Sequence, residues 1–163
     1  MNAVTHMEVI PLIKENKIWL GVNNRMDFIL QDKNTMNSIN SRWFTNLPHK
    51  KHSTPITLAQ SYSAERYPKY DNYDAINVDK TKDIPKDYYG EIGVPITFLD
   101  KYCPNQFEII GVFNWFQKLD EENGYICGTQ IGFTDKNGKT IIWNGPTVNN
   151  KPIYKRILIR LKK

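Results

Sequence analysis

The pattern of hydrophobic and polar positions predicts a short helix near the start of the chain and a buried strand soon after it. Residues 5–17, THMEVIPLIKENK, carry an apolar helical face and a capping-box spacing between Thr5 and Glu8. Pro11 falls inside this pattern, so we expect a kink or a late helix start. The glycine-bounded apolar run KIWLGV at 17–22 predicts a buried strand. A helix followed closely by such a strand is typical of a layered α/β sheet.

The middle of the chain alternates between strand candidates and polar segments. DFILQ, from Asp27, and RWFTNL at 42–47 are predicted strands. KNTMNSINS at 33–41 and PHKKHSTP at 48–55 are polar and are predicted loops. GVPITFLDKYCP at 93–104 predicts a two-turn helix that is opened by its first proline and stopped before its second.

The C-terminal third predicts further strands. QFEIIGVFNW at 106–115 is strand-like, and TQIGFT and KTIIW flank the turn sequence DKNG. The Asn137-Gly138 pair in that turn is a strong signal for a hairpin. IYKRILIRLK at 153–162 predicts another strand with two distinct faces. One face would carry Ile153, Lys155, Ile157, Ile159 and Leu161, and the other Tyr154, Arg156, Leu158, Arg160 and Lys162.

Composition places the chain among globular proteins. Its 163 residues, 40% of them hydrophobic, suit one domain with a sizeable core. No apolar run approaches the roughly 18 residues of a membrane span, and the N-terminal MNAVTHMEVI lacks the features of a signal peptide. Two cysteines, Cys103 and Cys127, fit a reducing compartment better than a disulfide framework. We therefore expect a cytoplasmic protein with no membrane partner.

Charge is distributed unevenly along the chain. The net charge is +5, yet residues 33–60 and 151–163 contain basic residues and no acid. Residues 71–91, between them, hold six carboxylates against three lysines. Two basic patches separated by an acidic interval favour a polyanionic partner such as nucleic acid. On charge alone, an ordinary solvated surface is an equal alternative.

The residues themselves support no catalytic mechanism. The histidines of HKKH at 49–52 lie in a predicted loop, where we expect solvated side chains rather than metal ligands. Cys103 and Cys127 are expected to be buried and inert. LDEENG at 119–124 is expected to form a turn rather than an acid/base pair, and no glycine-rich phosphate loop occurs. We therefore assign no catalytic, cofactor-binding or metal-binding residue.

Tyrosines and aspartates are concentrated in RYPKYDNYDAINV at 66–78. Such a segment could recognise a flat, polar ligand with its aromatic faces and carboxylates. Alternatively, it could be an irregular loop whose tyrosines cover the core, and we favour this structural role. The residues concerned are Tyr67, Tyr70, Tyr73, Asp71 and Asp74.

Longer segments resemble a known enzyme family. RWFTNL at 42–47, YPKYDNYDAINVDKTKDIPKDY at 67–88 and GVPITFLDKYCPNQFEIIG at 93–111 occur in this order. PLIKENKIWLGV at 11–22 and YKRILIRLKK at 154–163 accompany them. Together they resemble the C-terminal part of the EcoRI-type adenine-specific DNA methyltransferase family, over nearly the whole chain.

The resemblance implies a methyl transfer from S-adenosylmethionine to the exocyclic amine of adenine, with an N-P-P-[FY] motif holding the flipped base. This chain contains no N-P-P; the nearest sequence is NGP at 144–146. The family's glycine-rich cofactor turn is also missing. We therefore expect a C-terminal portion of such an enzyme, inactive and without bound cofactor on its own, whose catalytic N-terminal half or partner subunit lies elsewhere.

The resemblance also implies a fold of α/β to α+β class in two packed parts. Residues 1–32 would be late elements of a methyltransferase-type, Rossmann-like sheet, with DFILQ as its antiparallel edge. Residues 33–163 would form a β-rich target-recognition region, packed as one unit with the first part. Strand edges exposed by such a division make self-association plausible.

Double-stranded DNA is the partner that the resemblance implies. The tyrosines and aspartates named above would then be candidates for base stacking or recognition. A non-catalytic module for another ligand such as a sugar, and an inactive remnant, are the alternatives. The expected phosphate contacts are Arg42, Lys50, Lys51, Lys155, Arg156 and Arg160, each of which could instead be a solvated surface charge.

Overall fold

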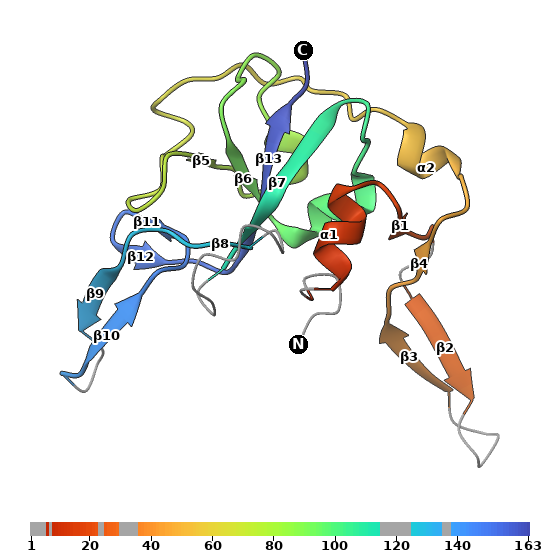
Figure 1. The fold of residues 1–163 in the computed structure, drawn as a ribbon, viewed down its shortest axis with the longest axis horizontal. Helices are drawn as coiled ribbons and strands as arrows, with labels where there is room; N and C mark the ends of the chain where they lie inside the picture. The colour runs from red at the N-terminus through yellow and green to blue at the C-terminus, as the bar shows by residue number, and fades with distance from the viewer. Residues whose placement is uncertain (1–5, 7, 23–24, 30–35, 115–124, 135–137) are drawn as a thin grey trace.

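The computed structural model describes residues 6, 8–22, 25–29, 36–114, 125–134 and 138–163. Its centre is a five-stranded mixed sheet of order β5-β6-β13-β7-β8 (Figure 1). The middle strand β13 (Arg156–Leu161) runs antiparallel to both β6 (Ile92–Val94) and β7 (Phe107–Phe113). At the two edges, β5 (Ile76–Asn77) is parallel to β6 and β8 (Tyr125–Ile126) is parallel to β7. The strands predicted at 106–115 and 153–162 are thus confirmed.

Among the described residues, four two-stranded antiparallel sheets accompany this centre. The hairpins β2–β3 and β9–β10 extend away from the central sheet in different directions (Figure 1). The predicted DKNG hairpin is confirmed by the β9–β10 pairing, and Gly138 has a positive φ of 79°. The bounds are β1 (Trp19–Leu20) with β4 (Phe44–Thr45), β2 (Arg25–Ile29) with β3 (Met36–Asn40), β9 (Ile131–Thr134) with β10 (Thr140–Trp143), and β11 (Thr147–Val148) with β12 (Lys151–Pro152).

The helices are short: α1 (Val9–Lys14), α2 (Lys50–Ser53), and the 3₁₀ helices η2 (Thr81–Asp83) and η3 (Ile96–Lys101). The late start predicted for α1 is confirmed, because it begins at Val9 and so places Pro11 in the first turn, where a backbone N–H has no helical partner. Glu8 makes no side-chain capping bond, and Thr5 lies outside the described residues. The helix predicted at 93–104 is confirmed as η3, which follows Pro95.

Two predicted loops are wrong. The polar segment at 33–41 contains β3, which pairs with β2 over five residue pairs. The segment at 48–55 contains α2, whose first turn is capped by the His49 imidazole accepting from the backbone N–H of His52. In β3 the backbone hydrogen bonds go to β2, and in α2 they are made within the helix and to the His49 cap. Neither element needs an apolar pattern to satisfy its backbone.

The strands predicted at 17–22 and from Asp27 both exist, but they do not join the central sheet in the described part of the chain. β1 pairs with β4 and β2 pairs with β3, so strands on either side of residue 32 are hydrogen-bonded to each other. The fold is accordingly β-rich with few helices and mixed sheets. A methyltransferase-type sheet in residues 1–32, and a division of the chain at that point, stay predictions.

Hydrophobic side chains cover both faces of the central sheet. On β13, Ile157, Ile159 and Leu161 belong to the larger core cluster, whereas Leu158 belongs to a smaller one. This confirms the predicted alternation over residues 157–161, whereas Ile153, predicted on the same face as Ile157, packs against the smaller cluster with Leu158 because it lies before β13 begins. The larger cluster includes Ile10 and Ile13 of α1, which packs against β7, together with Phe98 and Leu99 of η3. Burying each such side chain contributes roughly 1.5–3 kcal/mol, so the buried side chains of β13 contribute substantially to the stability of the fold.

A candidate nucleic-acid interface

Three of the six predicted phosphate contacts meet in one pocket, which we call the basic pocket. Its volume is about 250 Å³, and no carboxylate among the described residues lines it. Arg42 precedes β4, whereas Lys155 immediately precedes β13 and Arg156 is its first residue, so the fold brings together side chains more than 110 positions apart. The other lining residues are Leu20, Pro95, Ile96, Thr97 and Tyr154. Positive charge confined in this way favours an anionic ligand.

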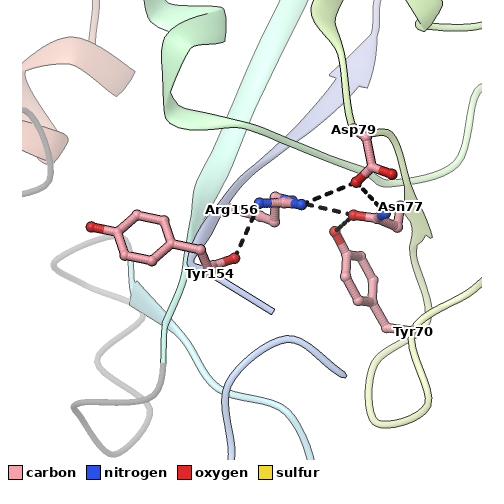
Figure 2. Close-up of polar contacts among 5 residues, drawn as sticks. All are labelled: Tyr70, Asn77, Asp79, Tyr154 and Arg156. Carbon is pink, nitrogen blue, oxygen red and sulfur yellow. Dashed lines mark hydrogen bonds and ion pairs between the residues drawn. The ribbon is translucent and has the colours of Figure 1, made fainter. Parts of the chain in front are cut away.

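Arg156 is held from behind by a chain of polar contacts (Figure 2). Its Nε donates to Asn77 Oδ1 at 3.2 Å and its Nη2 to Asp79 Oδ1 at 3.1 Å. Its Nη1 donates to the Tyr154 carbonyl at 3.3 Å, and the Tyr70 hydroxyl donates to the same Asn77 oxygen at 3.0 Å. The guanidinium therefore has little rotational freedom, and its direction is set by β5 and by the segment that follows it.

Arg42 and Lys155 are also positioned by the fold. The Nη1 atom of Arg42 lies 2.8 Å from Oδ1 of Asp100, at the end of η3. Lys155 is 7% exposed, and its Nζ lies 5.8 Å from the centroid of the Tyr154 ring. Burial lowers the pKa of Lys155 because the charged ammonium loses hydration. An anion in the pocket would restore part of the stabilisation that water no longer supplies.

The tyrosines and aspartates of 66–78 do not form a single surface. Tyr67 and Tyr70 are 3% and 5% exposed and belong to the core clusters. Burial raises the pKa of Tyr70, whose hydroxyl is bonded inside the protein. The Asp71 carboxylate accepts from the backbone N–H groups of Asn149 and Asn150, both of which have positive φ in the β11–β12 turn. These three residues thus take the structural role favoured above.

The remaining members of the stretch, Tyr73 and Asp74, lie in a second hollow, which we call the tyrosine pocket. Its volume is about 480 Å³, and it includes Arg160, a fourth predicted phosphate contact. Arg160 is already paired with Glu91 at 3.1 Å and with Glu108 at 3.5 Å. Lys69 pairs with Asp74 at 2.7 Å, and Tyr73 donates to Glu91 at 2.8 Å. The full lining is Lys69, Tyr73, Asp74, Tyr88, Tyr89, Gly90, Glu91 and Arg160.

The last two predicted contacts, Lys50 and Lys51, lie on α2. Lys50 is exposed, and Lys51 Nζ donates to the Val22 carbonyl at 3.4 Å. The prediction of solvated histidines beside them is wrong, because both imidazoles are partly buried. His49 bonds to the Leu20 carbonyl at 3.0 Å, and His52 stacks on Trp19 with ring centroids 4.2 Å apart. Burial, and secondarily His49, lowers the pKa of His52.

Several residues that shape the basic pocket were not predicted from the sequence. Thr97 and Tyr154 line it, and Asp79 and Asp100 orient its arginines from outside the lining. Tyr154 could have been found as the neighbour of two predicted contacts. The other three carry no local signal, because only the tertiary contacts of η3, β13 and the residues that follow β5 and precede β4 bring them together.

Other chemistry is absent from the described part of the chain. No group of three or more His, Cys, Asp or Glu side chains there could hold a metal ion. Cys103 is buried as predicted, and Cys127 is partly buried; neither forms a disulfide. Among the described helices, none has the length and apolar character needed to cross a bilayer. The LDEENG segment lies outside the described residues.

Comparisons with known proteins match almost the whole chain to one family. Residues 1–162 match the family described as "Adenine-specific methyltransferase EcoRI". The chain is 46% identical over 132 residues to Type II methyltransferase M.EcoRI of Escherichia coli, covering 68% of this chain and 40% of that protein. It is 34% identical over 148 residues to Type II methyltransferase M.MpnI of Mycoplasma pneumoniae, covering 76% and 46%.

A third relative shows the same relationship. It is Type II methyltransferase M.MgeORF184P of Mycoplasma genitalium, 35% identical over 162 residues, with 84% of this chain and 51% of the relative covered. The chain thus spans about half the length of these curated relatives. No solved structure matches the chain.

Proposed function

Since the chain belongs to the EcoRI family of adenine-specific methyltransferases, we propose that it is the DNA-recognition and structural portion of such an enzyme. In this proposal it contacts double-stranded DNA and transfers no methyl group by itself. The catalytic motif and the cofactor site belong to a family segment that it does not contain, supplied by an N-terminal half or by a partner subunit.

The basic pocket is the observation that carries the assignment to DNA contact. Type II methyltransferases of this family modify DNA, whose backbone is a dense row of phosphates. Three predicted contacts share a lining without a carboxylate, and Lys50 adds an exposed charge on α2. Phosphate contacts of this kind position a protein on the duplex, whereas base contacts determine its sequence preference.

The residues that line the basic pocket and the tyrosine pocket do not fit S-adenosylmethionine. The three cations of the basic pocket would repel the positively charged sulfonium of the cofactor. In the tyrosine pocket, Asp74 and Glu91 could attract a sulfonium, but both already have partners at 3.1 Å or less. The chain also lacks the N-P-P motif. We therefore derive no methyl-transfer step from it.

Fluorescence anisotropy of a labelled adenine-containing duplex, titrated at several salt concentrations, tests the proposal. We expect an affinity that falls steeply with salt, because each neutralised phosphate makes the slope of log K against log salt more negative by about 0.9. Reversing both charges in Lys50→Glu/Lys51→Glu should weaken binding and flatten this slope by about 2. Failure of the folded chain to bind at low salt would contradict a recognition role for this chain alone.

The matched control is Lys80→Glu/Lys82→Glu, which makes the same change in net charge. Lys80 and Lys82 are exposed and lie in the acidic interval, and neither lines the basic pocket, although Lys80 follows Asp79, the partner of Arg156. Binding should be reduced much less in this variant. Equal losses in both double variants would mean that net charge, rather than the surface around α2, attracts the duplex.

A further inference from the structure

We propose that the basic pocket is a binding site for one phosphate group, which we call the phosphate seat. Arg42, Lys155 and Arg156 bind the phosphate, and Thr97 lies at the rim. The inference rests on the proposed function where the phosphate is that of a DNA backbone. A free phosphate or phosphomonoester presents the same oxygens, so the chemistry is shared between the two sources and the experiment below separates them.

The size of the pocket suits a small group. At about 250 Å³ it is smaller than the roughly 300–1,000 Å³ typical of pockets that enclose drug-sized ligands. A phosphate with one or two waters fits such a volume, whereas a nucleoside with its sugar would extend out of it. The exposed side chains of Thr97 and Tyr154 mark the side from which a ligand enters.

The arginines are held ready for an anion. Asp79 and Asp100 neutralise part of their charge from outside the lining and fix their orientation at 3.1 Å and 2.8 Å. A guanidinium has five N–H donors, and three of those of Arg156 already donate to Asn77, Tyr154 and Asp79, so its second hydrogens on Nη1 and Nη2 are the donors left for an oxygen in the pocket. Because these side chains are already ordered, binding costs little additional conformational entropy.

Lys155 supplies the charge that gains most from a ligand. Its ammonium is removed from water, and burial lowers its pKa. Its Nζ lies 5.8 Å from the centroid of the Tyr154 ring, and Arg42 and Arg156 line the same pocket. A phosphate bound among these cations would accept charge-assisted hydrogen bonds from the ammonium and from both guanidiniums, so all three cations favour the same ligand.

The tyrosine pocket differs from the basic pocket in a way that disfavours phosphate. It also contains two cations, yet Asp74 and Glu91 line it beside them. Carboxylates within the lining would repel a phosphate at short range. A phosphate seat is therefore assigned to the basic pocket and not to its neighbour.

The test uses two probes and two variants of the chain. Inorganic phosphate is titrated while backbone amide shifts of residues 96–97 and 154–156 are followed by NMR, and the labelled duplex is titrated by anisotropy. Lys155→Met removes a pocket charge while keeping an unbranched apolar stem, so it should fold. The matched control, Lys69→Met, removes a lysine from the tyrosine pocket.

We expect saturable phosphate shifts in the unmodified chain and in Lys69→Met, and at least a tenfold weaker response in Lys155→Met. Duplex affinity should fall about fivefold to tenfold in Lys155→Met, with a salt slope lower by about 0.9. Loss of the phosphate response with unchanged duplex affinity would support the seat and assign it to free phosphate.

Two further outcomes separate the inference from the proposed function. Saturable phosphate shifts in a chain that binds no duplex would contradict the DNA role and leave the seat standing. Absence of phosphate shifts in the unmodified chain, or equal shifts in Lys155→Met, would overturn the seat even if the duplex still binds.

Discussion

The basic pocket and the tyrosine pocket contain similar residues but differ in the position of their carboxylates. Both combine arginine, lysine and tyrosine, and in both a carboxylate pairs with an arginine. In the basic pocket those carboxylates lie outside the lining, whereas in the tyrosine pocket Asp74 and Glu91 are part of it. Three lining cations without an acid favour an anion; two cations with two acids do not. Whether a pocket favours an anion therefore depends less on how many basic residues line it than on whether their carboxylate partners also line it.

The largest effect is expected at the buried support of the basic pocket. Gly93 on β6 faces the Tyr70 hydroxyl, and a methyl group at this position would overlap it. Gly93→Ala should lower the free energy of unfolding by about 3 kcal/mol, because overpacking a buried site is costly, and should displace the Asn77–Arg156 contacts. Urea unfolding measures this. Gly132→Ala is the control, since its nearest neighbour, Thr140 Cγ2, would be 3.7 Å away; equal losses would contradict the close packing.

A second prediction separates the two pockets by their response to duplex DNA. Arg156→Gln should weaken duplex binding about tenfold, equivalent to about 1.4 kcal/mol, because it removes a charge that faces an acid-free lining. Arg160→Gln should change affinity much less, since Glu91 and Glu108 already neutralise this side chain. Anisotropy at one fixed salt concentration compares them. A larger loss in Arg160→Gln would reverse the ranking of the two pockets.

The third prediction concerns a hydroxyl in each region. Tyr70→Phe removes the buried bond to Asn77, which should cost about 1 kcal/mol of folding stability. Tyr73→Phe removes the bond to Glu91 at a partly exposed site, where water can replace the lost donor, so the cost should be smaller. Paired denaturant curves test the order. Similar costs would show that burial of Tyr70 does not distinguish these hydroxyls.

The smallest expected effect is a gain in folding stability rather than a loss. Because the folded-state pKa of Lys155 is lowered, protonated Lys155 disfavours folding at neutral pH. This penalty is relieved as pH rises from the folded pKa to the unfolded value of about 10.5, so stability attributable to this group increases over that window. Lys155→Met should therefore raise the melting temperature slightly at pH 7, whereas Lys69→Met should leave it unchanged or lower it slightly. A lower melting temperature in Lys155→Met would contradict the desolvation account.

Elements with strong periodicity or explicit turn chemistry were predictable. The strand at 153–162, the hairpin around DKNG and the helix after Pro95 all exist where local patterns indicated them. The polar strand β3 and helix α2 were missed because backbone pairing with β2 and capping by His49 stabilise them, and β3 has no alternating apolar signal. The family was recognisable because long segments match in order, which a short motif cannot provide.

The candidate site was predictable only in part. The sequence identified Arg42, Lys155 and Arg156 as cations of interest, but equally Arg160, which is neutralised by two acids. It could not distinguish Tyr67 and Tyr70, which are core residues, from Tyr73, which reaches a surface pocket. All three lie in one short polar stretch, 67–73, and what packs against each ring is decided only in the folded chain.

The amino-acid sequence by itself determined the family, the β-rich character and the apolar faces of the central strand, because these depend on long similarity and on side-chain alternation. The tertiary structure decided which charges remain available to a ligand. Arg42 meets Lys155 and Arg156 only when β4, η3 and β13 are assembled. Charge availability depends on distances between residues far apart in sequence, and those distances exist only in the folded chain.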